Sequence, residues 1–177
     1  QKDLLNTLEG FGATISNRKV NSTDEVPYEV NISLYDAMKG TIENGEDKWQ
    51  NERYICAHTI LLALEGIPAF YIHSLLATEN AHDLQKETGQ ARSINRYCWE
   101  QKALNKELSD ADGHHKVIFD ELKRRIDIRK KQPAFHPNAT QLTLHLGDQL
   151  FAFWRESLDR HQSIFALHNV SDQTAKV

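Results

Sequence analysis

The residues best suited by type and spacing to bind a ligand are two arginines, Arg92 and Arg96, in the stretch Ala-Arg-Ser-Ile-Asn-Arg. Because they are four positions apart, their side chains can share one face of a helix or turn. The planar guanidinium group suits hydroxyl, carboxylate or phosphate ligands. Spacing alone favours a simpler interpretation, in which both are surface arginines paired with carboxylates such as Glu87 or Glu100.

Nine histidines raise the question of a metal site. Glu79 and His82 have the Glu-x-x-His spacing of di-iron helices, but such a site needs two of these pairs and the sequence has one. His114 and His115 are adjacent, so on a helix they point about 100° apart and share an ion poorly. Zinc motifs, phosphate-binding glycine loops and a nucleophile elbow are absent. We therefore predict no metal, no cofactor and no self-evident catalytic centre.

The elements that would position these residues centre on Glu46 to Leu76, a long helical pattern that runs into an apolar segment. Gly66 and Pro68 end the predicted helix. Ile67 to Leu76 lacks polar alternation, which predicts a strand buried on both faces within a parallel sheet. One helix and one strand make half of an α/β unit, which cannot close a core alone. Steps of three and four residues predict which side chains of the helix face the core: Trp49, Cys56, Ala57, Ile60, Leu61 and Leu64.

The flanking patterns predict further helices and, near the C-terminus, a change to alternating strands. Helices are predicted at residues 3–10, 34–40, 82–88, 97–108 and 111–131, and strands at 13–20, 28–32, 141–146, 150–155 and 162–168. Gly147-Asp148 is a hairpin signal between two of the last three strands. The predicted fold class is an α/β part followed by part of an antiparallel β domain.

Length and composition narrow the function classes. At 177 residues, with 40% hydrophobic and 26% charged residues, the chain can form one ordinary domain or parts of two. A net charge of −4 gives no electrostatic case for nucleic acid, and the basic cluster from Lys123 to Lys131 is interpreted as the solvated face of a helix. No apolar run has the length of a membrane span and the polar start is not a signal peptide, so we predict a cytoplasmic protein without membrane contact. The helical pattern is already under way at Gln1, so we expect sequence to precede it.

Four stretches, taken in order, resemble the sucrose phosphorylase subfamily of glycoside hydrolase family thirteen, within the α-amylase superfamily. They read PYEVNISLYDAM, LLALEGIPAFYIHSLLATEN, ARSINRYCW and IRKKQPAFHP. The second resembles the segment around the eighth barrel strand, which usually reads Leu-Pro-Gly-x-Pro-x-x-Tyr-Tyr; Glu65 stands here where proline is common. Each motif alone is weak, but four in this order are a strong signal, and the likeness covers most of the chain, from about Asp3 to Val170.

The resemblance implies that residues 1–132 are the C-terminal part of a catalytic (β/α)8 barrel and residues 133–177 the start of a C-terminal β domain. The family's catalytic nucleophile, acid/base glutamate and His-Asp pair lie on earlier strands and match no residue of this chain. The chain alone is therefore expected to be catalytically inert. The face and edge of Ile67 to Leu76 should then stay open, or be covered by homo-oligomerisation.

The family reaction is a retaining transfer of a glucosyl unit from an α-glucoside to inorganic phosphate, giving α-glucose 1-phosphate. By motif, Arg92 matches the arginine that contacts the glucosyl unit. Tyr28 matches a phosphate-binding tyrosine of the mobile acceptor loop, and Glu29 occupies the neighbouring glutamine position. The usual loop reads Leu-Asp-Leu-Tyr-Gln, whereas this chain has EVPYE, with Val26 in the place of the fructose-contacting aspartate. This departure favours another donor, such as glucosylglycerate, glucosylglycerol or a sucrose phosphate.

Two other interpretations stay open. The chain can belong to an α-amylase-type hydrolase, in which water takes the place of phosphate, or it can be a non-catalytic α+β interaction module whose helices contact a partner. A self-contained module would bury Ile67 to Leu76 internally, whereas a barrel fragment would not. An assay of the complete parent protein separates the phosphorylase from the hydrolase, since only a phosphorylase releases glucose 1-phosphate in a phosphate-dependent reaction.

Overall fold

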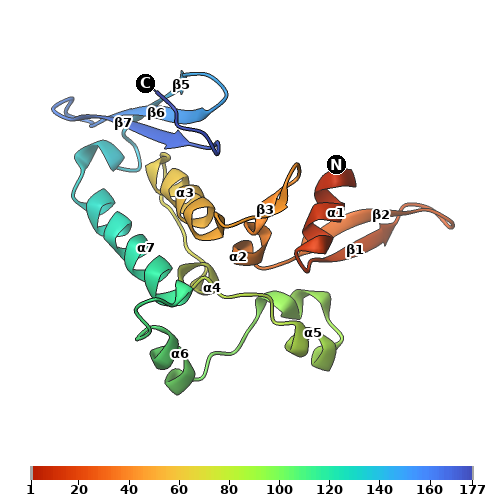
Figure 1. Cartoon of the computed structure of the whole chain (residues 1–177). Coiled ribbons are helices and arrows are strands. Elements are labelled where there is room, and N and C mark those ends of the chain that lie inside the picture. The colour runs from red at the N-terminus through yellow and green to blue at the C-terminus, as the bar shows by residue number, and fades with distance from the viewer. Residues whose placement is uncertain (1, 177) are drawn as a thin grey trace. The chain divides into compact units, whose positions relative to one another are not determined.

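Figure 1 shows the computed structural model of the chain, which describes residues 2–176. Contacts divide the chain into two compact units. The first contains the residues up to Tyr54 together with Tyr71–Phe119, and the second contains Ile55–Phe70 together with the residues from Asp120 onward. The chain thus passes between the units inside two long helices, α3 (Gln50–Ala63) and α7 (His114–Lys130), and once more between Phe70 and Tyr71. These units do not follow a single boundary after residue 132, and the division into a barrel part and a β domain stays a prediction.

A helix and a β-hairpin open the first unit: α1 (Lys2–Gly10), β1 (Thr14–Lys19) and β2 (Glu25–Asn31). The two strands pair antiparallel, with Thr14 opposite Asn31. Asn31 is buried, and its Nδ2 donates to the carbonyl of Thr14 at 3.2 Å and to Oγ of Ser16 at 3.0 Å. The side chain therefore closes the base of the hairpin. The predicted helix and both predicted strands of this region are confirmed.

Short elements make up the rest of the first unit. They are α2 (Leu34–Ala37), β3 (Gly40–Thr41), β4 (Gly45–Glu46), α4 (Ile72–Leu75), α5 (His82–Thr88), the 3-10 helix η1 (Ala91–Asn95) and α6 (Gln101–Glu107). The Oγ of Ser33 accepts a 3.0 Å hydrogen bond from the amide of Asp36, which caps α2 as expected of serine at this position. The buried apolar side chains of this unit include Phe11, Tyr35, Tyr54, Ile94 and Ile118.

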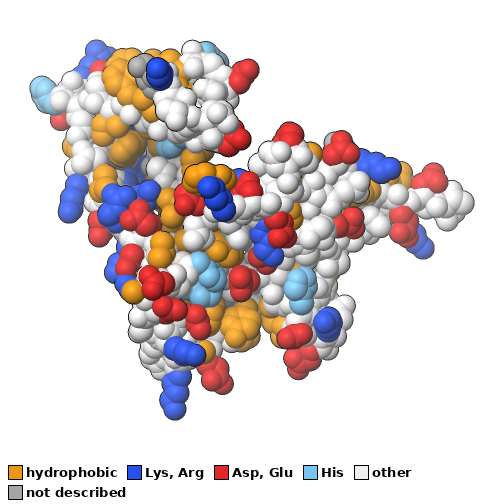
Figure 2. All heavy atoms as spheres, in the orientation of Figure 1, with side chains coloured by type: hydrophobic (Ala, Val, Ile, Leu, Met, Phe, Trp, Pro, Cys, Tyr) orange, Lys and Arg blue, Asp and Glu red, His pale blue; other side chains and the backbone are white. Residues whose placement is uncertain are grey.

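The second unit carries a three-stranded antiparallel sheet of order β5-β6-β7, preceded by the 3-10 helix η2 (Pro133–Phe135). The strands are β5 (Thr140–His145), β6 (Leu150–Glu156) and β7 (Ser163–Asn169). Gly147 has a φ of +90° in the turn before β6, a conformation open to glycine without steric cost. The predicted β module is confirmed. Figure 2 shows hydrophobic side chains gathered on the surface of this sheet. Leu142, Phe165 and Leu167 are among the exposed apolar residues of its strands.

Two arginines organise the interior of the second unit. Arg155 is 0% exposed, and its guanidinium donates to the carbonyls of Ala63 at 2.7 Å and His136 at 3.0 Å. Arg129 donates to the carbonyls of Leu62, of Leu64 and, at 2.9 Å, of Gly66. These acceptors include the last carbonyls of α3, which lack partners inside the helix and favour a nearby cation. The basic cluster is therefore only partly a solvated face, and the prediction is wrong for Arg129.

The predicted buried strand at Ile67 to Leu76 is wrong. Residues 72–75 form α4, and residues 67–71 belong to no strand. Ile67 is 85% exposed and Ile72 is 55% exposed. Every strand pair among residues 2–176 is antiparallel. A strand exists only where a neighbour accepts its backbone hydrogen bonds, and no other segment within residues 2–176 occupies that position.

The inward face of α3 also differs from the prediction. Tyr54, His58 and Leu62, at successive steps of four, are buried, whereas Trp49 is 44% exposed. The hydroxyl of Tyr54 donates to the carbonyl of Ser74 at 2.6 Å, which satisfies its polar atom inside the first unit. Tyr54 and His58 thus face inward, although hydrophobicity alone predicted that other residues, such as Trp49, would do so.

Candidate functional site

The first unit brings together two of the three predicted binding residues. Arg92 lies in η1 and Glu29 lies in β2, 63 positions apart in sequence. The Nε of Arg92 donates to both carboxylate oxygens of Glu29, at 3.0 and 3.1 Å. The hydrogen bond and charge of Glu29 raise the pKa of Arg92, so the guanidinium stays cationic. The suggested partners Glu87 and Glu100 are wrong for Arg92, since the structure pairs it with Glu29.

Buried neighbours hold the η1 backbone that carries Arg92. Ser93 and Ile94 are 5% and 0% exposed, and the carbonyl of Ile94 accepts a 2.8 Å hydrogen bond from the amide of Ala81. The Oγ1 of Thr88 donates to Oγ of Ser93 at 2.7 Å. These contacts fix the main chain on either side of Arg92, although its own side chain is 60% exposed. Arg92 therefore has an exposed side chain on a main chain that hydrogen bonds and buried neighbours hold in place.

Tyr28, the third predicted residue, has a different partner. It is 62% exposed, and the guanidinium carbon of Arg18 lies 5.6 Å from the centre of its ring. The strand pairing shifts register between Ser16, which pairs with Glu29, and Asn17, which pairs with Pro27, so Tyr28 is the extra residue of a β-bulge. The structure therefore joins Glu29 to Arg92 and Tyr28 to Arg18. Arg18 was missed by the sequence reasoning because its spacing to Tyr28 has meaning only once the hairpin register is known.

A cavity of about 620 Å³ also lies in the first unit, lined by aromatic and ionisable side chains. The Nε1 of Trp99 donates to Oγ1 of Thr78 at 3.0 Å, and Nδ1 of His115 lies 2.7 Å from the carbonyl oxygen of Leu76. The Trp99 and His115 rings meet edge to face, with centres 5.1 Å apart. This wall is held in place by its own hydrogen bonds. Nothing in the spacing of these residues indicated the cavity.

Histidines and carboxylates share this cavity. Glu79, His82 and His114 line it. Burial, and secondly the neighbouring His115, lower the pKa of His114, so its ring is neutral near pH 7. Tyr35 stacks on His114 with ring centres 4.6 Å apart, and burial raises the pKa of Tyr35 to about 12. Within residues 2–176, no group of three or more histidine, cysteine, aspartate or glutamate side chains is arranged to hold a metal ion.

Comparison with known proteins identifies relatives of the chain. No family model matches it. It is 31% identical over 95% of its length to a glucosylglycerate phosphorylase of Spirochaeta thermophila, and 32% identical over 77% to one of Escherichia coli. A crystal structure of sucrose 6F-phosphate phosphorylase from Thermoanaerobacter thermosaccharolyticum matches 96% of the chain with a TM-score of 0.60 and 20% identity. The predicted resemblance to the sucrose phosphorylase subfamily is confirmed.

The resemblance covers only part of each relative. The chain spans 28% and 24% of the two glucosylglycerate phosphorylases and 33% of the sucrose 6F-phosphate phosphorylase chain, over the C-terminal part of these proteins. Its helices and small antiparallel sheets thus correspond to a partial domain of a phosphorylase-like fold. No helix formed by residues 2–176 combines the length and the hydropathy that crossing a bilayer requires.

Proposed function

We propose that the chain is the C-terminal part of a retaining glucoside phosphorylase, which transfers a glucosyl unit from an α-glucoside to inorganic phosphate. The observation that carries this proposal is the similarity to glucosylglycerate phosphorylases over as much as 95% of the chain. In such a reaction a carboxylate displaces the aglycone, a second carboxyl group in its protonated form gives its proton to the departing oxygen, and phosphate then takes the glucosyl unit from the first carboxylate. The chain supplies binding groups, and the two carboxylates lie outside it, so the chain alone is inert.

Arg92 is the proposed glucosyl-binding residue. Glu29 engages its Nε, and the two terminal nitrogens have no hydrogen-bonding partner within residues 2–176. Two parallel donors directed away from an anchored Nε suit the paired hydroxyls of a sugar or the oxygens of an anion. Glu29 therefore orients the guanidinium rather than contacting substrate through a free carboxylate.

Tyr28 is the proposed phosphate-binding residue. Its exposed hydroxyl is a donor, and Arg18 over its ring adds a positive charge beside it. A phosphate dianion must be held against competing water, which favours cationic and hydroxyl donors at the acceptor position. Val26 on the same strand offers no carboxylate to a fructosyl hydroxyl, so we propose glucosylglycerate ahead of sucrose as the donor.

Residues 1–132 are proposed as the end of a (β/α)8 barrel, and residues 133–177 as the start of a β domain, in a cytoplasmic enzyme. The exposed apolar segment from Ile67 to Ile72 supports the first assignment, since a barrel strand without neighbours is left open. The sheet β5-β6-β7 supports the second. A self-contained interaction module is disfavoured because it would bury that segment.

The test is a chimera in which residues 1–177 replace the matching C-terminal part of the Escherichia coli glucosylglycerate phosphorylase. We expect release of glucose 1-phosphate from glucosylglycerate that depends on added phosphate, and little release from sucrose. Hydrolysis that phosphate does not change would support the α-amylase-type hydrolase instead. Circular dichroism of the chimera and of the unmodified enzyme separates loss of folding from loss of chemistry.

A further inference from the structure

The β1–β2 hairpin of the first unit carries an arginine that no carboxylate neutralises (Figure 1). Arg18 is exposed on β1, and it forms no ion pair with any residue from 2 to 176. Its guanidinium carbon lies 5.6 Å from the centre of the Tyr28 ring. Such a contact uses the flat face of the guanidinium, so the N–H groups at its edge stay free to bind an anion.

The pairing of the two strands places Arg18 on the same face of the hairpin as Glu29. Residues directly opposite each other in an antiparallel pair share a face, and so do residues two apart on one strand. Ser16 is opposite Glu29, and Arg18 is opposite Val26. Because Ser16 and Arg18 are two apart, these four side chains share one face, and the β-bulge at Tyr28 brings positions 26 and 29 to it together.

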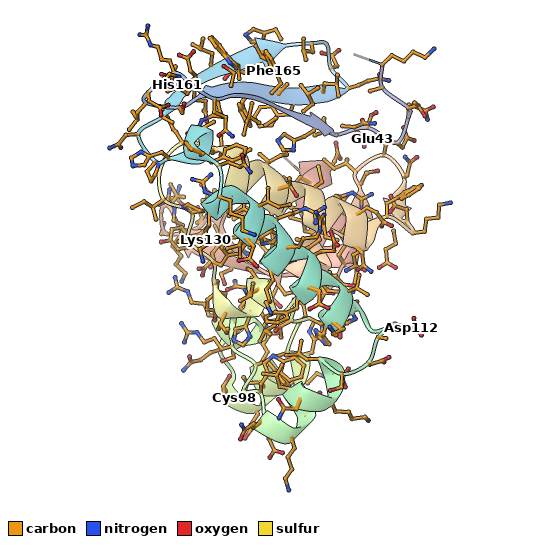
Figure 3. All side chains as sticks on the ribbon, turned by 90° about the vertical axis from the view of Figure 1, so that its left-hand side faces the viewer. Glu43, Cys98, Asp112, Lys130, His161 and Phe165 are labelled. Carbon is orange, nitrogen blue, oxygen red and sulfur yellow. The ribbon has the colours of Figure 1, made fainter. Side chains whose placement is uncertain are left out.

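This face has an excess of positive charge. The carboxylate of Glu29 is already paired, since it accepts from Nε of Arg92 at 3.0 Å. Val26, opposite Arg18, brings no charge. The basic residues at the C-terminal end of α7, among them Lys130, which Figure 3 labels, belong to the second unit and are not part of this face. Of the hairpin side chains on this face, Arg18 is therefore the cation left for a ligand.

The proposed reaction brings two anions in turn to one position. In a retaining double displacement, the aglycone leaves and the second nucleophile enters on the same side of the glucosyl carbon. With glucosylglycerate as the donor, the first occupant of this position carries a carboxylate and the second is phosphate. The planar fork of a guanidinium suits the oxygens of both. We infer that Arg18 binds the carboxylate of the departing glycerate and then the phosphate, and so selects α-glucosides with an anionic aglycone.

This inference rests on the proposed function and gives Arg18 a binding role alone. The acid group outside the chain gives a proton to the glycerate oxygen as the bond to the glucosyl carbon breaks. It takes a proton from phosphate as the new bond forms. Arg18 gains and loses no proton in either step. Its replacement should therefore affect the two anions and leave the reaction of a neutral donor unchanged.

The test uses the chimera with two donors that differ at one group, since glucosylglycerol has a hydroxymethyl group where glucosylglycerate has the carboxylate. Arg18→Gln should lower kcat/KM for glucosylglycerate about tenfold or more, and kcat/KM for glucosylglycerol less than about twofold. Each constant reports the first step of a two-step mechanism, so phosphate does not enter this comparison. With either donor, kcat/KM for phosphate should fall about tenfold or more.

Lys19→Gln is the matched control. It removes the same charge from the next position of β1, which is opposite Glu25 and on the other face of the hairpin, and it should change each constant less than about twofold. Arg18→Lys keeps a charge without the planar fork and should recover part of the loss. Thermal melting followed by circular dichroism should be the same for all of these chimeras, because both side chains are exposed.

Anion binding can be measured without catalysis. In the 177-residue chain, the NMR signal of the Arg18 Nε–H should shift when sodium glycerate or sodium phosphate is added in excess. Glycerol, or sodium chloride at the same ionic strength, should not shift it. A chimera that turns over no donor, together with this shift, would contradict the proposed function and leave the anion site in place.

Several outcomes would overturn the inference. Arg18→Gln would have to lower the two donors equally, affect only one of the two anions, or have no more effect than Lys19→Gln. In an inactive chimera, an Arg18 signal that neither anion shifts in the 177-residue chain would overturn it as well.

Discussion

Arg155 of the second unit and Arg92 of the first unit use the same side chain in opposite ways. In the second unit Arg155 is buried and donates to main-chain carbonyls, so its charge serves to satisfy backbone groups. In the first unit Arg92 is 60% exposed, is held through one nitrogen by Glu29, and keeps its terminal nitrogens free of partners within residues 2–176. An arginine is thus structural where each of its three nitrogens donates to the main chain, and a candidate binding group where its terminal nitrogens have no such partner.

The largest effect expected from this comparison is a loss of stability when Arg155 is replaced. Arg155→Ala leaves the carbonyl of Ala63 without its donor, removes one of the two donors to the carbonyl of His136 and opens space in the core, so the unfolding free energy should fall by about 3–5 kcal/mol. Urea denaturation measures the change. Arg160→Ala is the control, because that side chain is 84% exposed and only loosely paired with Glu156, and it should change stability by less than about 0.5 kcal/mol. Equal effects of the two substitutions would contradict the structural role of Arg155.

Arg129 should show a smaller effect of the same kind. Arg129→Ala removes the donor to the carbonyls of Leu62, Leu64 and Gly66 at the end of α3, and it should lower unfolding free energy by about 1–3 kcal/mol. Arg129→Lys keeps the charge near the helix end and should recover part of this loss. No recovery would indicate that the fork of hydrogen bonds matters more than the charge.

Substitution of Arg92 should lower activity and leave stability almost unchanged. In the chimera, Arg92→Ala should reduce kcat/KM for phosphorolysis about tenfold or more, while stability changes by less than about 1 kcal/mol because the ion pair is exposed. Glu29→Gln keeps an acceptor for Nε and should retain most of the activity. A large loss of stability without a catalytic effect would give Arg92 the same structural role as Arg155 and remove the distinction between the two arginines.

The smallest expected effect concerns pH and an exposed ion pair on α7. Hydrogen bonds from Arg124 and Arg125 lower the pKa of Glu121 from 4.5 to about 2. Because the folded-state pKa is depressed, the stabilisation is complete above the unfolded pKa near 4.5 and is lost as the pH falls through about 2. Solvent screening of these exposed groups limits it to about 1 kcal/mol or less. The stability difference between Glu121→Gln and the unsubstituted chain should therefore shrink from pH 5 to pH 2, and a difference that stays constant would contradict this role.

The β module shows what the sequence could predict. Its three strands follow from local alternation, and the turn before β6 follows from a glycine that tolerates positive φ. The hairpin of the first unit, the cap at Ser33 and the helices α1 and α5 are local in the same sense. The resemblance to the family came from the order of the motifs, which is also a property of the sequence alone.

The sequence by itself determined these local elements and the phosphorylase resemblance, because turn chemistry, capping and periodicity act within a few residues. Tertiary structure alone decided that Arg92 contacts Glu29 rather than Glu87 or Glu100, since 63 positions separate the partners. It also decided that Arg155, one of the polar residues of an alternating strand, is buried, because carbonyls from three other segments need its donors. The apolar run at Ile67 misled the sequence reasoning for the same reason: a strand depends on neighbours, and none is present among residues 2–176.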